Sequence, residues 1–129
     1  MAVMSFTIPG TPVGAPRMTQ ADKWKQRPCV VRYRSWKDAA RKAAGELPPT
    51  SSITYVSWTA YFEPPASWSN KRRAAAMDER HRSKPDRDNL DKALLDALFP
   101  EDQGISDGII RKRWGVWARL EVEIGYESE

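Results

Sequence analysis

The stretch from Ser52 to Phe62 constrains the fold most, because its alternation puts apolar or aromatic residues on both sides of one extended strand. Strands that are apolar on both faces are typical of an inner position in a sheet. Pro64 and Pro65 follow and end the extended segment. We therefore predict a sheet in which residues 52–62 form a central strand.

Three further segments have strand patterns. Residues 3–8 alternate apolar and polar side chains and are followed by the turn residues 9–12. Residues 109–116 and 120–126 are the other two, and we expect them to form a hairpin that turns near Trp117 and Ala118. The sheet should thus contain about four strands.

Helical patterns fill the intervals between these strands. One helix is expected from an N-cap at Ser35 to Ala44, and a second from Asp88 or Asn89 to Leu98, before Pro100. Ser67 or Ser69 would cap a short basic helix over 71–76. The order predicts a single α+β domain over residues 1–129, with a small mixed or antiparallel sheet and two main helices packed on it.

The chain has one cysteine, Cys29, and one histidine, His81. This excludes a disulfide framework and a Cys/His zinc site, and it leaves no Cys-His dyad unless these two residues meet. Any metal must therefore be held mainly by oxygen. No apolar run approaches the roughly 18 residues of a membrane span and no signal segment is present, so we expect a cytoplasmic protein without membrane contact.

Positive charge is concentrated in one part of the chain. The formal net charge is +4, but residues 17–42 hold nine Lys and Arg against two Asp, whereas residues 99–129 hold seven acids against four bases. Much of the basic part falls in a proline-rich stretch over 11–31, which we expect to be a long loop. A polyanionic partner would bind there rather than at the C-terminal part.

The segment 84–92 has the sequence Lys-Pro-Asp-Arg-Asp-Asn-Leu-Asp-Lys. Pro85 favours an extended approach, in which Asp86 and Asp88 point the same way, and Lys92 shares a helix face with Asp88. Two close carboxylates suit Mg²⁺ or Mn²⁺, which polarises a phosphodiester and activates water, while a lysine stabilises the developing charge. The alternative is that Asp86 or Asp88 only caps the helix, with Asp91 and Lys92 exposed.

The run from Lys84 to Leu98, with Ile105-Ser-Asp-Gly-Ile-Ile110 after it, resembles the RusA family of Holliday junction resolvases, small endonucleases common in prophages. The family has an Asp-x-Asp-Asn-Leu-x-Lys core and a further acid before a strand. The resemblance implies that Asp86 and Asp88 are catalytic metal ligands, that Lys92 is the catalytic lysine and that Asp107 is the later metal-binding acid. Ser106 stands where the family often has a second Asp. Asp96 lies at the family's Asp-Ala-Leu, and we expect a salt bridge with Lys92, with a catalytic role as the alternative.

The resemblance also implies a homodimer that binds four-way DNA junctions and cuts them by paired nicks with Mg²⁺ or Mn²⁺, in recombination and repair, inside a bacterial or phage-infected cell and without an organic cofactor. Trp24 and Trp36 could stack on unpaired bases, but packing against the sheet is the favoured interpretation for each of them. A non-catalytic nucleic-acid-binding module, a silent subunit of a phage replication complex and a nuclease for other branched DNA remain open. Candidate phosphate contacts are Arg17, Lys23, Lys25, Arg27, Arg72 and Arg73.

Overall fold

Four strands form one mixed sheet in the computed structural model, which describes residues 1–23 and 26–128. Their spatial order is β1-β4-β2-β3, with bounds β1 (Ala2–Pro9), β2 (Ile53–Phe62), β3 (Ile110–Trp114) and β4 (Arg119–Tyr126). β4 runs antiparallel to β1 and β2, and β3 runs parallel to β2. The predicted α+β class and the inner position of residues 52–62 are confirmed.

The predicted hairpin between the last two strands is wrong. β3 and β4 lie on opposite sides of β2, because Trp58 pairs with Ile110 on one side and with Val122 on the other. The connection crosses the end of β2, and a Cβ on Gly115 would lie 2.9 Å from the ring of Tyr61. Glycine therefore lets the chain pass over β2. Val122, only 2% exposed, then becomes part of a second inner strand.

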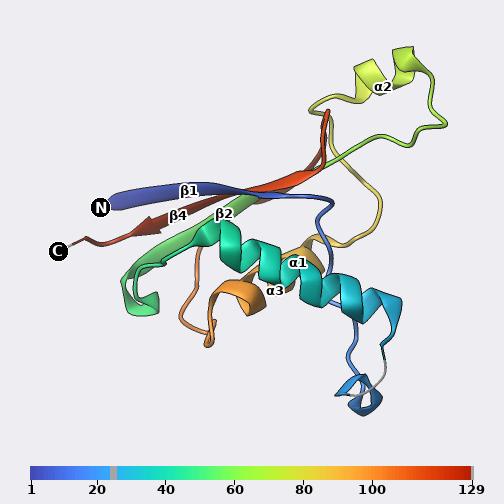
Figure 1. The fold of residues 1–129 in the computed structure, drawn as a ribbon. Coiled ribbons are helices and arrows are strands. Elements are labelled where there is room, and N and C mark those ends of the chain that lie inside the picture. The colour runs from blue at the N-terminus through green and yellow to red at the C-terminus, as the bar shows by residue number, and fades with distance from the viewer. Residues whose placement is uncertain (24–25, 129) are drawn as a thin grey trace.

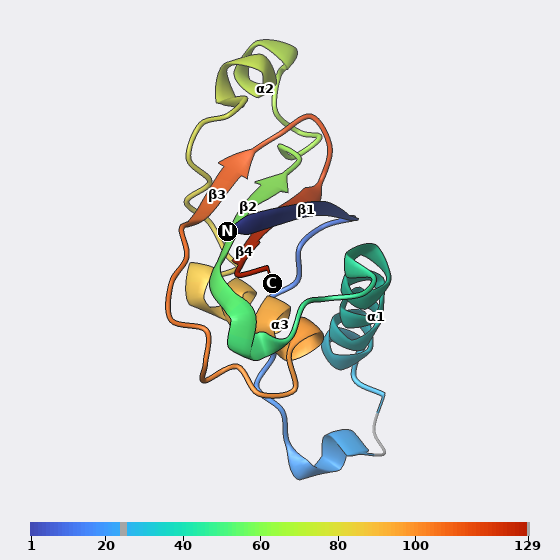
Figure 2. The ribbon, with the colours of Figure 1, turned by 90° about the vertical axis from the view of Figure 1, so that its left-hand side faces the viewer.

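Alternation along the strands gives the sheet a covered face and an open face. The helices α1 (Pro28–Ala44) and α3 (Arg87–Leu98) pack together over the covered face (Figures 1 and 2). None of the helices in the described residues is long and apolar enough to cross a bilayer. Each aliphatic side chain buried here contributes about 1.5–3 kcal/mol, and the covered face carries Ile8, Val56, Trp58, Ala60, Phe62, Leu120, Val122 and Ile124.

α1 begins at Pro28, so the predicted start at Ser35 is wrong and the preceding loop is shorter than expected. Proline is favourable in the first turn of a helix, where the backbone N–H has no partner within the helix. The loop itself contains a short 3-10 turn, η1 (Gln20–Lys23), and a second such turn, η2 (Thr50–Ser52), precedes β2. The buried stripe of α1 recurs every three or four residues and consists of Val30, Tyr33, Trp36, Ala40 and Ala44.

The helix α2 (Asn70–Ala76) stands out from the two layers on an arm formed by residues 63–80 (Figures 1 and 2). Ser69, one of the two predicted caps, accepts a hydrogen bond from the Arg72 backbone N–H at 3.2 Å. Arg73 Nη1 donates to the carbonyls of Pro64 and Pro65, each at 2.8 Å. α2 has no buried residue, and the arm is attached to β3 by backbone hydrogen bonds of Asp78 and Glu79 with Trp114 and by packing of Trp68 on the Trp114 ring.

Candidate active site

Asp86 and Asp88 stand at the start of α3. Asp86 occupies the N-cap position with an extended backbone (φ −69°, ψ 147°), and Asp88 lies in the first turn. The side chain of Asp86 makes no capping hydrogen bond, so capping does not account for its carboxylate. Both residues are exposed, and the positive end of the helix dipole favours negative charge there. The helix start therefore presents two oxygen donors to solvent.

Lys112 on β3 holds the chain immediately before Asp86. Its ammonium donates to the carbonyl oxygens of Ser83 and Pro85, the second at 2.7 Å. Burial lowers the pKa of Lys112, and the Asp86 carboxylate acts in the opposite direction. Lys112 was not among the site residues predicted from the sequence. The available signal was alternation, since Lys112 occupies the position between two core-facing residues of β3.

The loop after β1 also contacts the carboxylate segment. A Cβ on Gly14 would lie 3.1 Å from Pro85 Cβ and 3.3 Å from Asn89 Cβ. The Ala15 N–H donates to the carbonyl of Asn89 at 3.1 Å. Arg17 is exposed and two residues further on, which is at most about 7 Å of extended chain. The loop thus brings one of the predicted phosphate-binding residues close to the start of α3.

Asp91, the third acid of the segment, is turned toward the sheet. Its Oδ1 accepts a hydrogen bond from Trp58 Nε1 at 2.9 Å. The Trp58 side chain belongs to the core and is 2% exposed. Asp91 therefore joins α3 to β2, and its carboxylate satisfies a buried indole N–H.

Lys92 forms the expected ion pair with Asp96, at 3.2 Å between Nζ and Oδ2. Asp96 also accepts a hydrogen bond from the Tyr33 hydroxyl at 3.1 Å. Burial, with the Asp96 charge adding to it, raises the pKa of Tyr33 to about 12. Asp96 thus links α3 to α1. It also holds the Lys92 ammonium beside Asp96 itself, one helical turn after Lys92. The catalytic role of Lys92 stays a prediction.

Asp107 lies just before β3, at another part of the sheet. Ser106 Oγ donates to Asp107 Oδ1 at 2.7 Å, and the backbone carbonyl of Asp107 accepts from the backbone N–H of Val56. With Ser57 and Glu123 it lines a hollow of about 590 Å³. In residues 1–23 and 26–128, no three His, Cys, Asp or Glu side chains gather closely enough to hold a metal ion. The structure therefore does not group Asp107 with the two acids of α3.

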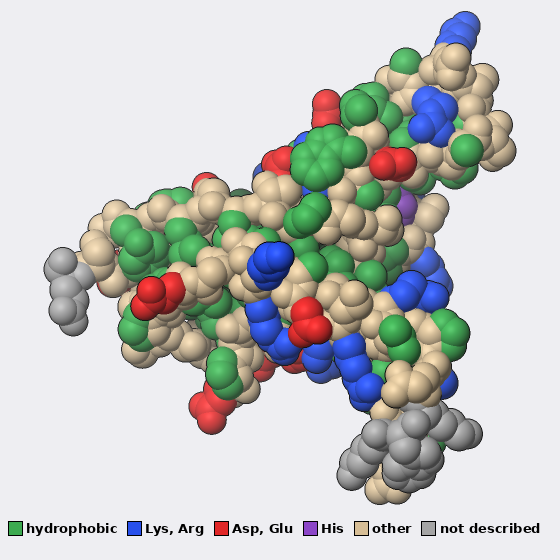
Figure 3. All heavy atoms as spheres, in the orientation of Figure 1, with side chains coloured by type: hydrophobic (Ala, Val, Ile, Leu, Met, Phe, Trp, Pro, Cys, Tyr) green, Lys and Arg blue, Asp and Glu red, His purple; other side chains and the backbone are tan. Residues whose placement is uncertain are grey.

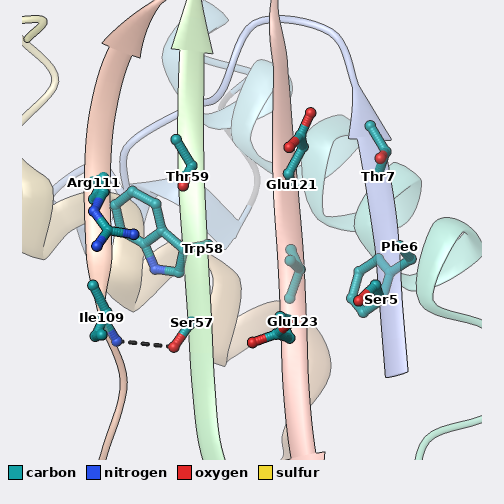
Figure 4. A pocket seen from close by; sticks show the side chains of 11 residues that line it. Ser5, Phe6, Thr7, Ser57, Trp58, Thr59, Ile109, Arg111, Glu121 and Glu123 are labelled. Carbon is teal, nitrogen blue, oxygen red and sulfur yellow. Dashed lines mark hydrogen bonds between the residues drawn. The ribbon is translucent and has the colours of Figure 1, made fainter. Parts of the chain in front are cut away.

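The open face of the sheet has a polar hollow of its own, of about 400 Å³ (Figure 4). Thr7, Ser57, Arg111 and Glu121 are among the residues that line it, and Ser57 Oγ accepts from the backbone N–H of Ile109 at 2.9 Å. Of the predicted site residues that the structure describes, none lines this hollow. It lies across the sheet from α3, so it is separate from the carboxylate site.

The basic loop before α1 is held by Arg27. Its Nε donates to Asp22 Oδ1 at 2.8 Å and its Nη2 to the carbonyl of Arg17 at 3.0 Å. The hydrogen bonding between Arg27 and the Asp22 carboxylate is the main reason why the pKa of Asp22 lies well below its usual range. Lys23 ends η1, and Lys25 lies outside the described residues. Further Lys and Arg side chains gather on the helix layer (Figure 3).

The arm carries the other two predicted phosphate contacts. Arg72 stacks on the ring of Trp68, with 3.7 Å between the guanidinium carbon and the ring centroid, whereas Arg73 is engaged with the arm's own carbonyls. For Trp36 the favoured interpretation, packing in the core, is confirmed, because it belongs to the buried stripe of α1 and is 6% exposed. Trp24 lies outside the described residues.

The residues at the start of α3 fit a hard divalent cation. Mg²⁺ is usually bound through one or two carboxylates and keeps several waters, which phosphate oxygens can displace. Asp86, with no capping bond, and Asp88 supply such a donor pair. His81 does not join them, since its ring stacks on Phe62 at 4.1 Å within the fold.

The sequence profile described as Endodeoxyribonuclease RusA matches residues 9–125 of the 129-residue chain. The small α+β domain is therefore of the class of DNA-cleaving enzymes that cut within a strand. Because the match covers almost the whole chain, the protein belongs to the RusA family of Holliday junction resolvases. No curated protein sequence gives a significant match.

Proposed function

We propose that this protein is a metal-dependent endodeoxyribonuclease that resolves four-way DNA junctions by paired, symmetric nicks in recombination and repair. Membership of the RusA family supports DNA cleavage at such junctions. The observation that carries the metal dependence is the exposed Asp86 carboxylate, free of a capping bond and followed by the exposed Asp88. We also propose a homodimer, because a two-fold dimer presents equivalent sites to two equivalent strands of a junction.

In this mechanism Asp86 and Asp88 would hold Mg²⁺ or Mn²⁺ in the free protein. Asp107 is the proposed third acid, which would join them only in the complex with DNA. When bound, the ion supplies Lewis-acid polarisation of the phosphodiester and lowers the pKa of a water molecule. Lys92 places positive charge beside the charge that develops at the phosphate. This role requires the exposed lysine to leave its ion pair with Asp96.

DNA affinity in this proposal comes from basic groups on the loop after β1 and on the arm. Arg17 is carried by the loop that contacts Asn89, and Arg72 stands on the arm. Contacts of this kind neutralise phosphates and add affinity with little base specificity. They suit an enzyme that selects a DNA shape.

The test is cleavage of a synthetic four-way junction with and without Mg²⁺. We expect symmetric nicks from the native protein, and their loss in Asp86→Asn and Asp88→Asn with junction binding retained. Asp38→Asn, an exposed change of the same charge on α1, is the matched control and should cleave normally. Binding without cleavage in Mg²⁺ and Mn²⁺ over a range of pH would instead support a non-catalytic binding module. Equal cleavage of flaps and junctions would support a nuclease for other branched DNA.

A further inference from the structure

Lys112 is a charged residue in a core-facing position of the sheet. Its neighbours on the same side of β3, Ile110 and Trp114, pack against the apolar core. Lysine is rarely placed among such residues unless its ammonium is paired. The hydrogen-bond partners of this ammonium therefore indicate the role of Lys112.

The Lys112 ammonium bridges the backbone carbonyls on either side of Lys84. It donates to the oxygens of Ser83 and Pro85, and the residue after Pro85 is Asp86. An ammonium has three N–H donors, and hydrogen bonds from a charged donor are stronger than those between neutral groups. Two of the three donors thus fix the backbone path that leads into the carboxylate pair.

The backbone of Lys112 holds the same segment from its other end. Its carbonyl accepts from the His81 N–H at 3.2 Å. The His81 ring is fixed in turn, since it stacks on Phe62 and packs edge-on against Trp114. The centroids of the His81 and Trp114 rings are 4.4 Å apart. Residues 81–85 are therefore tied to β3 at both ends through one residue.

We propose that Lys112 is a positioning residue for the cleavage reaction, which fixes Asp86 relative to Asp88 through the carbonyls of Ser83 and Pro85. This inference rests on the proposed function of the two acids. Displacing a reacting group by about 1 Å can cost about 100-fold in rate, and groups that orient metal ligands commonly change metal affinity by about 10- to 100-fold. Lys112 itself contacts neither DNA nor metal in this role.

The experiment compares Lys112→Met with Arg111→Met, a change at an exposed arginine on the open face of β3 that alters the net charge by the same amount. Methionine keeps the apolar stem and removes the donors. Lys112→Gln, which keeps a neutral N–H donor group, is the second variant. Three readouts are used: amide hydrogen exchange over residues 82–90 without metal or DNA, Mn²⁺ binding by the free protein, and single-turnover cleavage at saturating junction.

For Lys112→Met we expect faster exchange confined to residues 82–90, at least tenfold weaker Mn²⁺ binding and at least tenfold slower cleavage. Junction affinity in EDTA should change less than twofold, which separates positioning from loss of DNA contacts. Lys112→Gln should fall between the native protein and Lys112→Met, and Arg111→Met should match the native protein.

Native exchange rates in Lys112→Met, or native Mn²⁺ affinity and cleavage rate, would overturn the positioning role alone. If Lys112→Met does not fold, Lys112→Gln decides by the same criteria. A native protein that binds junctions but cleaves none overturns the proposed function and the positioning role with it.

Discussion

Replacing Asp91 by alanine should destabilise the protein without removing its chemistry, although Asp91 lies three residues after Asp88. The Asp91 carboxylate accepts the hydrogen bond of Trp58 Nε1, and the Trp58 side chain is 2% exposed. In Asp91→Ala the indole N–H loses this acceptor at a place that solvent does not reach. Asp88→Ala removes a carboxylate that is exposed instead.

The two costs follow from these surroundings. A buried donor left without its partner costs about 1–3 kcal/mol, and the charge on this acceptor favours the middle of that range, about 2 kcal/mol. Removing Asp88 loses its interaction with the helix dipole, about 0.5 kcal/mol. For a domain of this size 1 kcal/mol shifts Tm by about 4 °C. We expect a loss of about 8 °C for Asp91→Ala and about 2 °C for Asp88→Ala.

Thermal unfolding and junction cleavage, measured below the melting range, check this assignment together. Asp91→Ala should cleave within about threefold of the native rate, whereas Asp88→Ala should be inactive. Trp58→Phe removes the N–H, so in that background Asp91→Ala should lose most of its cost, as a double-mutant cycle would show. Equal melting temperatures for the two alanine variants, with cleavage lost in both, would refute the structural role and place Asp91 among the reacting groups.

Three other predictions concern charged residues. Because Asp107 is not grouped with the α3 acids, Asp107→Asn should weaken Mn²⁺ binding by the free protein less than threefold. Asp86→Asn should weaken it at least tenfold. Calorimetry measures both affinities, and equal losses would contradict this expectation. The pKa of Asp22 is lowered by its arginine partner, so its stabilisation is complete near neutral pH and is lost as the pH falls below about 4. Melts should show the gap between native protein and Asp22→Asn narrowing over that range, and a constant gap would be inconsistent with it. Arg17→Ala together with Lys25→Ala should weaken junction binding and reduce its log–log salt slope by about 2, which an unchanged slope would contradict.

The parts of the fold that follow from local periodicity could be predicted. The apolar alternation of β2 gave its inner position, and the spacing of Leu90, Ala93, Leu94 and Ala97 gave the buried face of α3. The short basic helix and its cap at Ser69 have the same origin. Each of these features depends on residues within one or two turns of chain.

Features that depend on distant residues were missed. The alternation of β3 and β4 is the same whether they form a hairpin or flank a third strand, so local periodicity does not distinguish the two arrangements. The observed arrangement has Gly115 pass over Tyr61, which is far away in the sequence. The proline-rich composition of residues 11–31 predicts a loop, yet Pro28 begins α1. Lys112 escaped notice because its partners are 27 and 29 residues away in the sequence.

The carboxylate segment shows why its acids have different roles. Three separate elements hold it: β3 through Lys112, β2 through the indole of Trp58, and the loop after β1 through the N–H of Ala15. These elements attach to backbone carbonyls or to Asp91, and no capping bond engages Asp86. A carboxylate that already accepts a buried hydrogen bond loses that bond if it binds a cation, whereas an exposed one exchanges only water. The neighbours supplied by the fold therefore assign structure to Asp91 and leave chemistry to Asp86 and Asp88, although all three are aspartates within six residues.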